Sequence, residues 1–206
     1  MRAGINTHRS KSLRMTEMIY IRNTTDFSFE NTVVTIGKFD GLHMGHQLLL
    51  KELKKYEALG LKSVVLSFDF APMEILKGQK IKPIYTEEEK LKLLEANGPE
   101  VYIEYPFTKK TADTEAIDFL REVLIEKLGA RVIVAGDDFA FGKDRRGDAD
   151  FIRAHASEFD YEAVICPKLL IGEEVVSSTA IRKKLECGDM RGAELMLNKS
   201  YFNETI

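Results

Sequence analysis

Five short apolar runs alternate with helical patterns along the chain, and this alternation is the strongest constraint on its fold. The runs cover residues 32–36, 63–68, 101–105, 131–135 and 162–166. Strands separated by helices are usually parallel and are joined by right-handed crossovers. We therefore predict the α/β class: a Rossmann-like, doubly wound parallel sheet of about five strands with helices on both faces.

Three helical patterns lie between these strands. Apolar residues at helical spacing run through residues 47–59 and stop at Gly60, a common residue after a helix end. A Thr-Glu-Glu-Glu capping box opens a second helix over residues 86–95. A third pattern covers residues 117–128. Each predicted helix thus connects two predicted strands.

Length and charge limit the domain organisation and the partners. With 206 residues, of which 44% are hydrophobic, we expect one domain with short appendages. Residues 1–17 are basic and are predicted to be a disordered extension. Residues 18–188 form the predicted domain, and residues 189–206 a C-terminal helical tail. The net charge of −3 gives no reason to expect nucleic acid or a membrane as partner.

The two cysteines bear on the compartment. Cys166 and Cys187 are far apart and show no metal-ligand spacing, so we read them as free thiols in a reducing environment. No apolar run approaches the ~20 residues that span a bilayer. We therefore expect a cytoplasmic protein.

The loop after the first strand is built to receive an anion. Its sequence is Gly-Lys-Phe-Asp-Gly-Leu-His-Met-Gly-His over residues 37–46, between a predicted strand and a predicted helix. A helix N-terminus offers unpaired N–H groups and a positive dipole end. His43 and His46 are three residues apart, so both rings can face one side. The glycine spacing fits neither the P-loop nor the dinucleotide fingerprint.

Polar residues also follow the other strands, where a doubly wound sheet binds its ligands. The strand ends lead into residues 69–72, 136–142 and, after the last apolar run, 177–182. In the last segment two serines and a threonine precede a helix, and Arg182 offers a planar fork of donors to phosphate. This predicts a second anion site facing the first. The alternative is that the hydroxyl residues are simple helix caps.

Four segments together resemble a known family. They are the histidine loop, the proline loop at residues 69–72, Gly-x-Asp-Phe-x-Phe-Gly at 136–142 and Ser-Ser-Thr-x-Ile-Arg at 177–182. In this order they resemble the adenylyltransferase module of bacterial FAD synthetases, within the His-x-Gly-His nucleotidyltransferase superfamily. The resemblance covers roughly residues 19–197.

The resemblance implies a reaction and a set of residues. The module joins AMP from ATP to FMN and gives FAD and pyrophosphate with Mg²⁺. The implied catalytic residues are His43, His46 and Arg182. The implied ATP-binding residues are Gly37, Phe39, Asp40, Gly45, Ser177, Ser178 and Thr179. The implied flavin-binding residues are Asp69, Pro72, Asp138, Phe139 and Phe141, and Asp69 is also the candidate metal ligand.

The residues fit this chemistry without the family name. The FMN phosphate is already an anion at neutral pH, so it needs positioning and charge compensation more than a nucleophilic side chain or a strong base. Histidine is mostly neutral at pH 7, yet a phosphate field raises its pKa and favours a donating imidazolium. We therefore interpret the two histidines as stabilisers of the leaving pyrophosphate.

Several assignments have structural alternatives. Asp69 and Asp138 are also typical turn or helix caps, and Phe139 and Phe141 are also typical core residues. The charged run at 143–147 is typical of a solvated surface, although it follows a ligand-facing strand end.

The chain departs from the family pattern in two ways. Met73 stands where the family usually has histidine, and a thioether cannot donate to a phosphate. The riboflavin kinase module that commonly follows is missing, so we expect FMN to come from a separate riboflavin kinase. Two other functions stay open: adenylyl or cytidylyl transfer to another phosphorylated metabolite, and a non-catalytic module that binds flavin or nucleotide.

Overall fold

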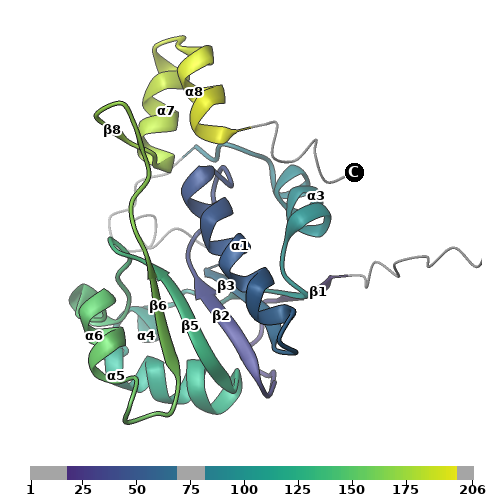
Figure 1. The fold of residues 1–206 in the computed structure, drawn as a ribbon, viewed down its shortest axis with the longest axis vertical. Helices are drawn as coiled ribbons and strands as arrows, with labels where there is room; N and C mark the ends of the chain where they lie inside the picture. Colours follow the sequence, from purple (N-terminus) through teal and green to yellow (C-terminus); the bar gives the residue numbers. More distant parts are fainter. Residues whose placement is uncertain (1–17, 69–81, 199–206) are drawn as a thin grey trace, which may run out of the picture.

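A single parallel sheet forms the centre of the molecule. The computed structural model describes residues 18–68 and 82–198. Six strands pair in the order β1-β4-β3-β2-β5-β6, and every pair is parallel (Figure 1). The strands are β1 (Ile19–Arg22), β2 (Thr32–Ile36), β3 (Lys62–Phe68), β4 (Val101–Tyr105), β5 (Ala130–Gly136) and β6 (Glu162–Cys166). The prediction of a doubly wound parallel sheet is confirmed.

The sheet has one more strand than predicted. β1 lies at the edge and pairs with β4, with Ile19 opposite Val101 and Arg22 opposite Glu104. Its side chains are mostly exposed, so the segment lacks the apolar run that marks a buried strand. This edge strand of four residues is stabilised by pairing with β4, and its own sequence has no apolar pattern that predicts a strand.

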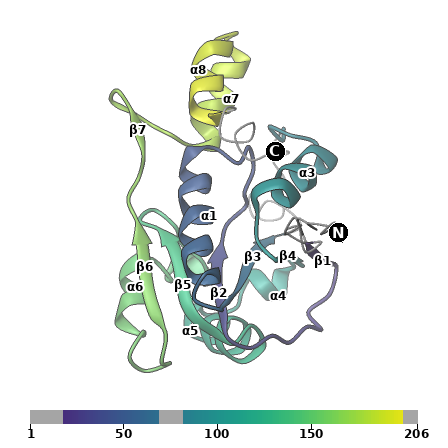
Figure 2. The same cartoon turned by 45° about the vertical axis from the view of Figure 1, so that its right-hand side comes forward.

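Helices cover both faces of the sheet, as Figure 2 shows from a second side. The helices that connect the strands are α1 (Met44–Glu57), α3 (Glu87–Asn97), α4 (Lys109–Ala112), α5 (Ala116–Phe119), the π-helix η1 (Leu120–Lys127), the 3₁₀-helix η2 (Lys143–Arg145) and α6 (Ala149–Ala154). α1 and α3 bury leucines against one face, together with Val33 and Val65. α5, η1 and α6 pack on the other face, against Val34 and Val64. Side chains of adjacent residues in a strand therefore pack into the hydrophobic cores on opposite faces of the sheet.

The helix boundaries refine the sequence predictions. α1 begins at Met44, three residues before the predicted start, so both histidines lie at its N-terminus. The capping box of α3 is confirmed, with Thr86 and Glu89 bonded reciprocally. The third predicted helix is divided into α5 and the π-helix η1. Apolar periodicity does not distinguish these two helix types over so few turns.

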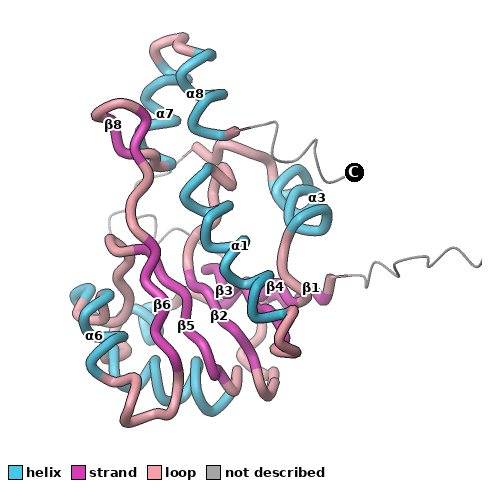
Figure 3. The backbone as a smooth tube through the Cα atoms, viewed as in Figure 1, coloured by secondary structure: helices cyan, strands magenta, loops and turns pink. Residues whose placement is uncertain are grey.

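A small C-terminal unit lies beyond the carboxyl ends of the strands. It consists of the hairpin β7 (Leu170–Ile171) and β8 (Glu174–Val175) and the helices α7 (Ser178–Glu186) and α8 (Met190–Leu197). In Figure 3 it follows β6 through the short connection at residues 167–169 and reaches the N-terminal end of α1. Ile181 and Met196 join α7 and α8 in one apolar cluster. The predicted boundary at 188/189 therefore falls between two packed helices.

Gln47 ties this unit to the main domain. Its side chain is buried, and its Nε2 donates to the Leu42 carbonyl at 2.9 Å and to the Leu197 carbonyl at 2.8 Å. The first bond fixes the loop before α1, and the second fixes the end of α8. One amide thus joins segments that are 150 residues apart.

The strand order places a crevice beside β2. The chain passes from β2 to β3 on one side and later returns to β5 on the other side. Such a reversal leaves a gap at the carboxyl ends of the two central strands, where ligands bind in open α/β sheets. Among the described helices, none has the length and hydropathy needed to cross a membrane.

Candidate active site

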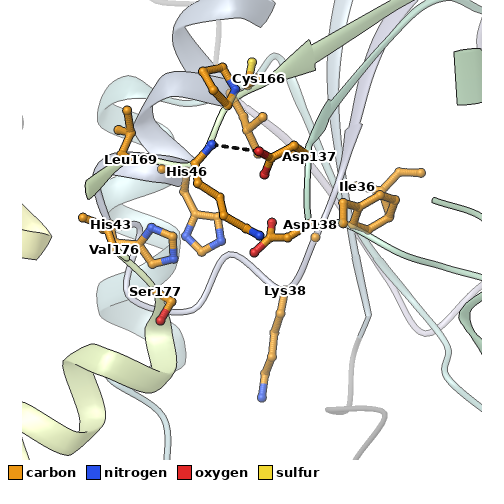
Figure 4. Close-up of a pocket in the computed structure, with 17 residues that line it drawn as sticks. Ile36, Lys38, His43, His46, Asp137, Asp138, Cys166, Leu169, Val176 and Ser177 are labelled. Carbon is orange, nitrogen blue, oxygen red and sulfur yellow. Dashed lines mark hydrogen bonds between the residues drawn. The ribbon is translucent and has the colours of Figure 1, made fainter. Parts of the chain in front are cut away.

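A cavity of about 240 Å³ lies at the predicted position, beyond the carboxyl ends of β2 and β5 (Figure 4). It is lined by residues 36–38, by His43, Gly45, His46 and Leu49 of the loop and α1, by residues 136–139, by residues 166–169 and by residues 176–177. Complete ligand pockets usually measure roughly 300–1,000 Å³. The cavity between the described walls is therefore smaller than a usual complete ligand pocket.

The two histidines are stacked on one wall. His43 is the N-cap residue of α1, and its ring centroid lies 3.8 Å from that of His46. The Phe39 ring, which is fully buried, supports His46 from 4.8 Å. The Nδ1 atoms of both histidines are buried and have no hydrogen-bond partner within the described structure. Buried polar atoms are rarely left unpaired, so this pair indicates a ligand.

Gly45 allows His43 to fold back over the helix start. A Cβ atom at Gly45 would lie 3.1 Å from His43 Cε1 and 3.2 Å from its Nδ1. That is tighter than ordinary van der Waals contact, so a side chain here would push the imidazole aside. The His-x-Gly-His motif thus requires glycine at position 45 because a side chain there would crowd the His43 ring.

Burial keeps both imidazoles neutral without a ligand. It lowers the pKa of His43 to about 4, although the charges of Asp138 and Asp40 act in the opposite direction. Burial, and then the nearby His43, hold the pKa of His46 well below the usual value of 6.5. A bound polyphosphate would raise both pKa values. We therefore expect anion binding at this site to be coupled to proton uptake.

This shift predicts acid sensitivity of the ligand-free protein. The unfolded chain protonates His43 near pH 6.5, whereas the folded chain does so near pH 4, so stability is lost as the pH falls through this window. At pH 5 the expected loss from His43 is about 2 kcal/mol relative to pH 7. Urea unfolding of wild type and His43→Gln at both pH values measures it. A loss of equal size in both proteins would contradict the expectation.

Acidic residues form the opposite wall of the cavity. Asp137 and Asp138 follow β5, and Asp137 Oδ2 accepts a hydrogen bond from the Lys168 N–H at 3.3 Å. Within the described residues, no group of three or more His, Cys, Asp and Glu is arranged to hold a metal ion. The carboxylates are hard oxygen donors, and Mg²⁺ bound with phosphate needs only one or two of them.

Three of the predicted site residues, Asp40, Ser178 and Arg182, make contacts within the protein. Asp40 is buried and binds Arg182, and its carbonyl accepts from Ser178 Oγ at 2.7 Å. Ser177 does line the cavity and caps α7 by accepting from the Ala180 N–H at 3.2 Å. Thr179 is exposed on the first turn of α7. The direct phosphate contacts predicted for Arg182, Ser178 and Thr179 stay predictions.

The two phenylalanines predicted to bind flavin have different positions. Phe139 is half-buried and lines the cavity. Phe141 is only 4% exposed and packs among Phe119, Phe139 and Phe151. Phe141 therefore packs in the core, and its predicted flavin contact stays a prediction. The Phe141 side chain is buried because its ring packs into this aromatic cluster.

Some predicted residues lie outside the cavity or the described chain. Asp69, Pro72 and Met73 fall outside the described residues, as do residues 1–17. Lys143, in the charged run after β5, pairs with Glu115 at 3.3 Å.

Sequence reasoning missed the wall formed by residues 166–169. Cys166 ends a predicted strand, so the same strand-end rule would have found Pro167 and Lys168. Burial raises the pKa of the Cys166 thiol to about 11. The thiol is therefore expected to be protonated at neutral pH.

Comparison with known proteins gives a consistent assignment. A family model described as FAD synthetase matches residues 26–180, well over half of the chain. The chain is 32% identical over 174 residues to the bifunctional riboflavin kinase/FMN adenylyltransferase of Haemophilus influenzae, covering 84% of this chain and 56% of that protein. It is 30% identical to the protein of the same name from Escherichia coli K12, covering 88% and 58%. The chain thus spans a little over half the length of these relatives.

Solved structures support the fold. A chain titled macrolide-efflux protein from Streptococcus pneumoniae superposes with a TM-score of 0.80 at 29% identity, over 88% of this chain and 62% of that chain. A pantoate-beta-alanine ligase from Francisella tularensis superposes with a TM-score of 0.51 at 12% identity, over 91% of this chain and 86% of that chain. The second likeness concerns the fold alone.

Proposed function

This chain belongs to the FAD synthetase family, and on that basis we propose that it transfers AMP from ATP to FMN, giving FAD and pyrophosphate. One observation carries the proposal beyond family membership. Two buried imidazole Nδ1 atoms without partners lie at the N-terminus of α1, in the crevice between β2 and β5. Unpaired donors at a helix N-terminus suit a polyphosphate.

The transfer itself needs positioned charge. An FMN phosphate oxygen forms a bond to the ATP α-phosphorus, while the bond from that phosphorus to the bridging oxygen breaks and pyrophosphate leaves. His43 and His46 compensate the negative charge that grows on the departing group. Ser177, at the N-terminus of α7, lines the cavity beside His43 (Figure 4).

The histidine stack favours a single added proton. The rings are 3.8 Å apart, and a charge on one lowers the pKa of the other. We therefore expect one imidazolium and one neutral ring when ATP is bound. The neutral ring still donates one hydrogen bond, so both residues contribute.

Mg²⁺ fits the acidic wall, where Asp138 and Asp137 would hold it together with phosphate oxygens and water. When bound, the ion neutralises phosphate charge. Asp69, the metal ligand and flavin contact expected from the sequence, stays a prediction, as does Pro72. We further propose that the protein is cytoplasmic, in line with its free thiols Cys166 and Cys187.

Incubation with ATP, Mg²⁺ and FMN, followed by chromatography, tests the function. FAD and pyrophosphate formation supports it. Consumption of ATP only with another phosphorylated acceptor, or binding without turnover, would replace it by one of the alternatives. Riboflavin offered in place of FMN should give no product.

Replacing Gly45 with alanine should separate activity from stability. Alanine is the better helix former by about 1 kcal/mol, so thermal stability should not fall. Its Cβ would nevertheless push on the His43 ring, which lies 3.1 Å away, and kcat should drop about tenfold. Gly60→Ala is a control for the substitution itself, since a Cβ there meets no atom within 4 Å, although its positive φ adds strain. Unchanged kcat in Gly45→Ala would contradict the steric role.

A further inference from the structure

Asp40 joins three segments around the cavity but does not line it. Its Oδ1 accepts from the Ile84 N–H at 3.0 Å, and its Oδ2 forms an ion pair with Arg182. Its carbonyl accepts from Ser178 Oγ at 2.7 Å. Arg182 in turn donates through Nε to the Lys82 carbonyl at 2.8 Å. The carboxylate therefore connects the histidine loop, residues 82–84 and α7.

The loop that carries Asp40 is strained. Phe39 and Leu42 have φ values of 50° and 43°, and Gly41 has 84°. Residues other than glycine adopt this conformation rarely, at roughly 1–3 kcal/mol each, and only when the surroundings hold them there. His43 follows Leu42 directly, so the strain sets where the first imidazole lies. The contacts of Asp40 hold this stretch together with the Gln47 bond to the Leu42 carbonyl.

We propose that Asp40 is a positioning residue for the adenylyl transfer. Through Arg182 and Ser178 it holds the N-terminus of α7 against the histidine loop, so the two anion-binding segments keep their spacing before substrate binds. Both charged groups are largely buried, with side chains 8% and 19% exposed, so the pair is shielded from solvent screening. This inference rests on the proposed function for its main readout.

A double-mutant cycle tests the proposal. Asp40→Asn keeps an acceptor for the Ile84 N–H and removes the charge that holds Arg182. We expect kcat to fall about 10- to 100-fold, with KM for FMN within twofold of wild type. Arg182→Met should have a similar effect. If Asp40 acts through Arg182, the double variant should be no more than about threefold worse than the worse single variant.

Conservative variants and a matched control sharpen the cycle. Asp40→Glu and Arg182→Lys keep the charges, so each should have a higher kcat than the corresponding neutral variant. If the neutral variants do not fold, the cycle is measured with these two variants instead. Asp150→Asn breaks an exposed Asp–Arg pair of 2.7 Å on α6 and should change kcat less than twofold.

Two outcomes overturn the inference. In the first, the fold-decrease in kcat of the double variant equals the product of the decreases in Asp40→Asn and Arg182→Met. In the second, Asp40→Asn has a normal kcat. If wild type itself forms no FAD, the proposed function fails. The ATP affinities of the same variants are then measured by calorimetry. We again expect the double variant to lose no more than about threefold beyond the worse single variant. If the fold-losses in ATP affinity of the two single variants multiply in the double variant, the role of Asp40 is overturned.

Discussion

Replacing His46 with alanine should lower kcat for FAD formation by about 10²–10³-fold, the usual effect of removing one donor to developing charge. Its buried Nδ1 has no other partner in the described structure, and its ring supports His43 from 3.8 Å. The affinity for FMN should stay within about threefold, because the charge it stabilises lies on the pyrophosphate side. Steady-state kinetics with a separate FMN titration measures both quantities.

His155 offers the matched control. It is also half-buried and stacked on an aromatic ring, with its centroid 4.1 Å from that of Phe151, but it does not line the cavity. His155→Ala should leave kcat within about twofold when measured at a temperature where both variants are folded. Near-normal turnover in His46→Ala would remove the role assigned to that histidine.

Replacing Phe141 with alanine should lower the free energy of unfolding by about 3–5 kcal/mol. Its ring lies 5.7 Å from that of Phe119, 5.7 Å from Phe139 and 5.9 Å from Phe151, at the centre of an aromatic cluster. The substitution would lose these ring contacts, leave a cavity and also lose the free energy gained by transferring the ring out of water. Urea unfolding with an unchanged m-value measures the loss.

Phe139→Ala makes the comparison specific. The Phe139 ring lines the cavity and is only partly buried, so its removal should cost less than half as much stability. It should raise KM for FMN about three- to tenfold if the ring stacks on the flavin, as aromatic stacking energies imply. A larger KM effect in Phe141→Leu than in Phe139→Ala would reverse the two roles.

Much of the fold could be predicted from the sequence, because buried strands and amphipathic helices leave apolar patterns. All five predicted strands are present as β2 to β6. β1 could not be found in this way, since its stability comes from pairing with β4 and from a polar cluster in which Tyr20 Oη donates to the buried Glu104 at 2.7 Å. The π-helical form of η1 is likewise a tertiary property.

The candidate site was predictable where a local rule applied. The strand-end rule brought His43, His46, Asp138, Phe139 and Ser177 into one cavity. It could not predict the partners of Asp40 and Arg182, which are 142 residues apart and meet only through the fold. Nor could it predict the low pKa of His43, because burial depends on every wall of the cavity.

The bond between Gln47 and the Leu197 carbonyl has a consequence for biosynthesis. β2, α1 and β3 are neighbours in sequence and can pair early, whereas this bond and the Asp40–Arg182 pair wait for residues 150 and 142 positions later, respectively. At about 5–20 residues per second, the ribosome needs roughly 7–30 seconds to add them. A nascent chain therefore carries both imidazoles for many seconds before it has a pocket. Substrate binding should appear abruptly with the last helices instead of growing with chain length.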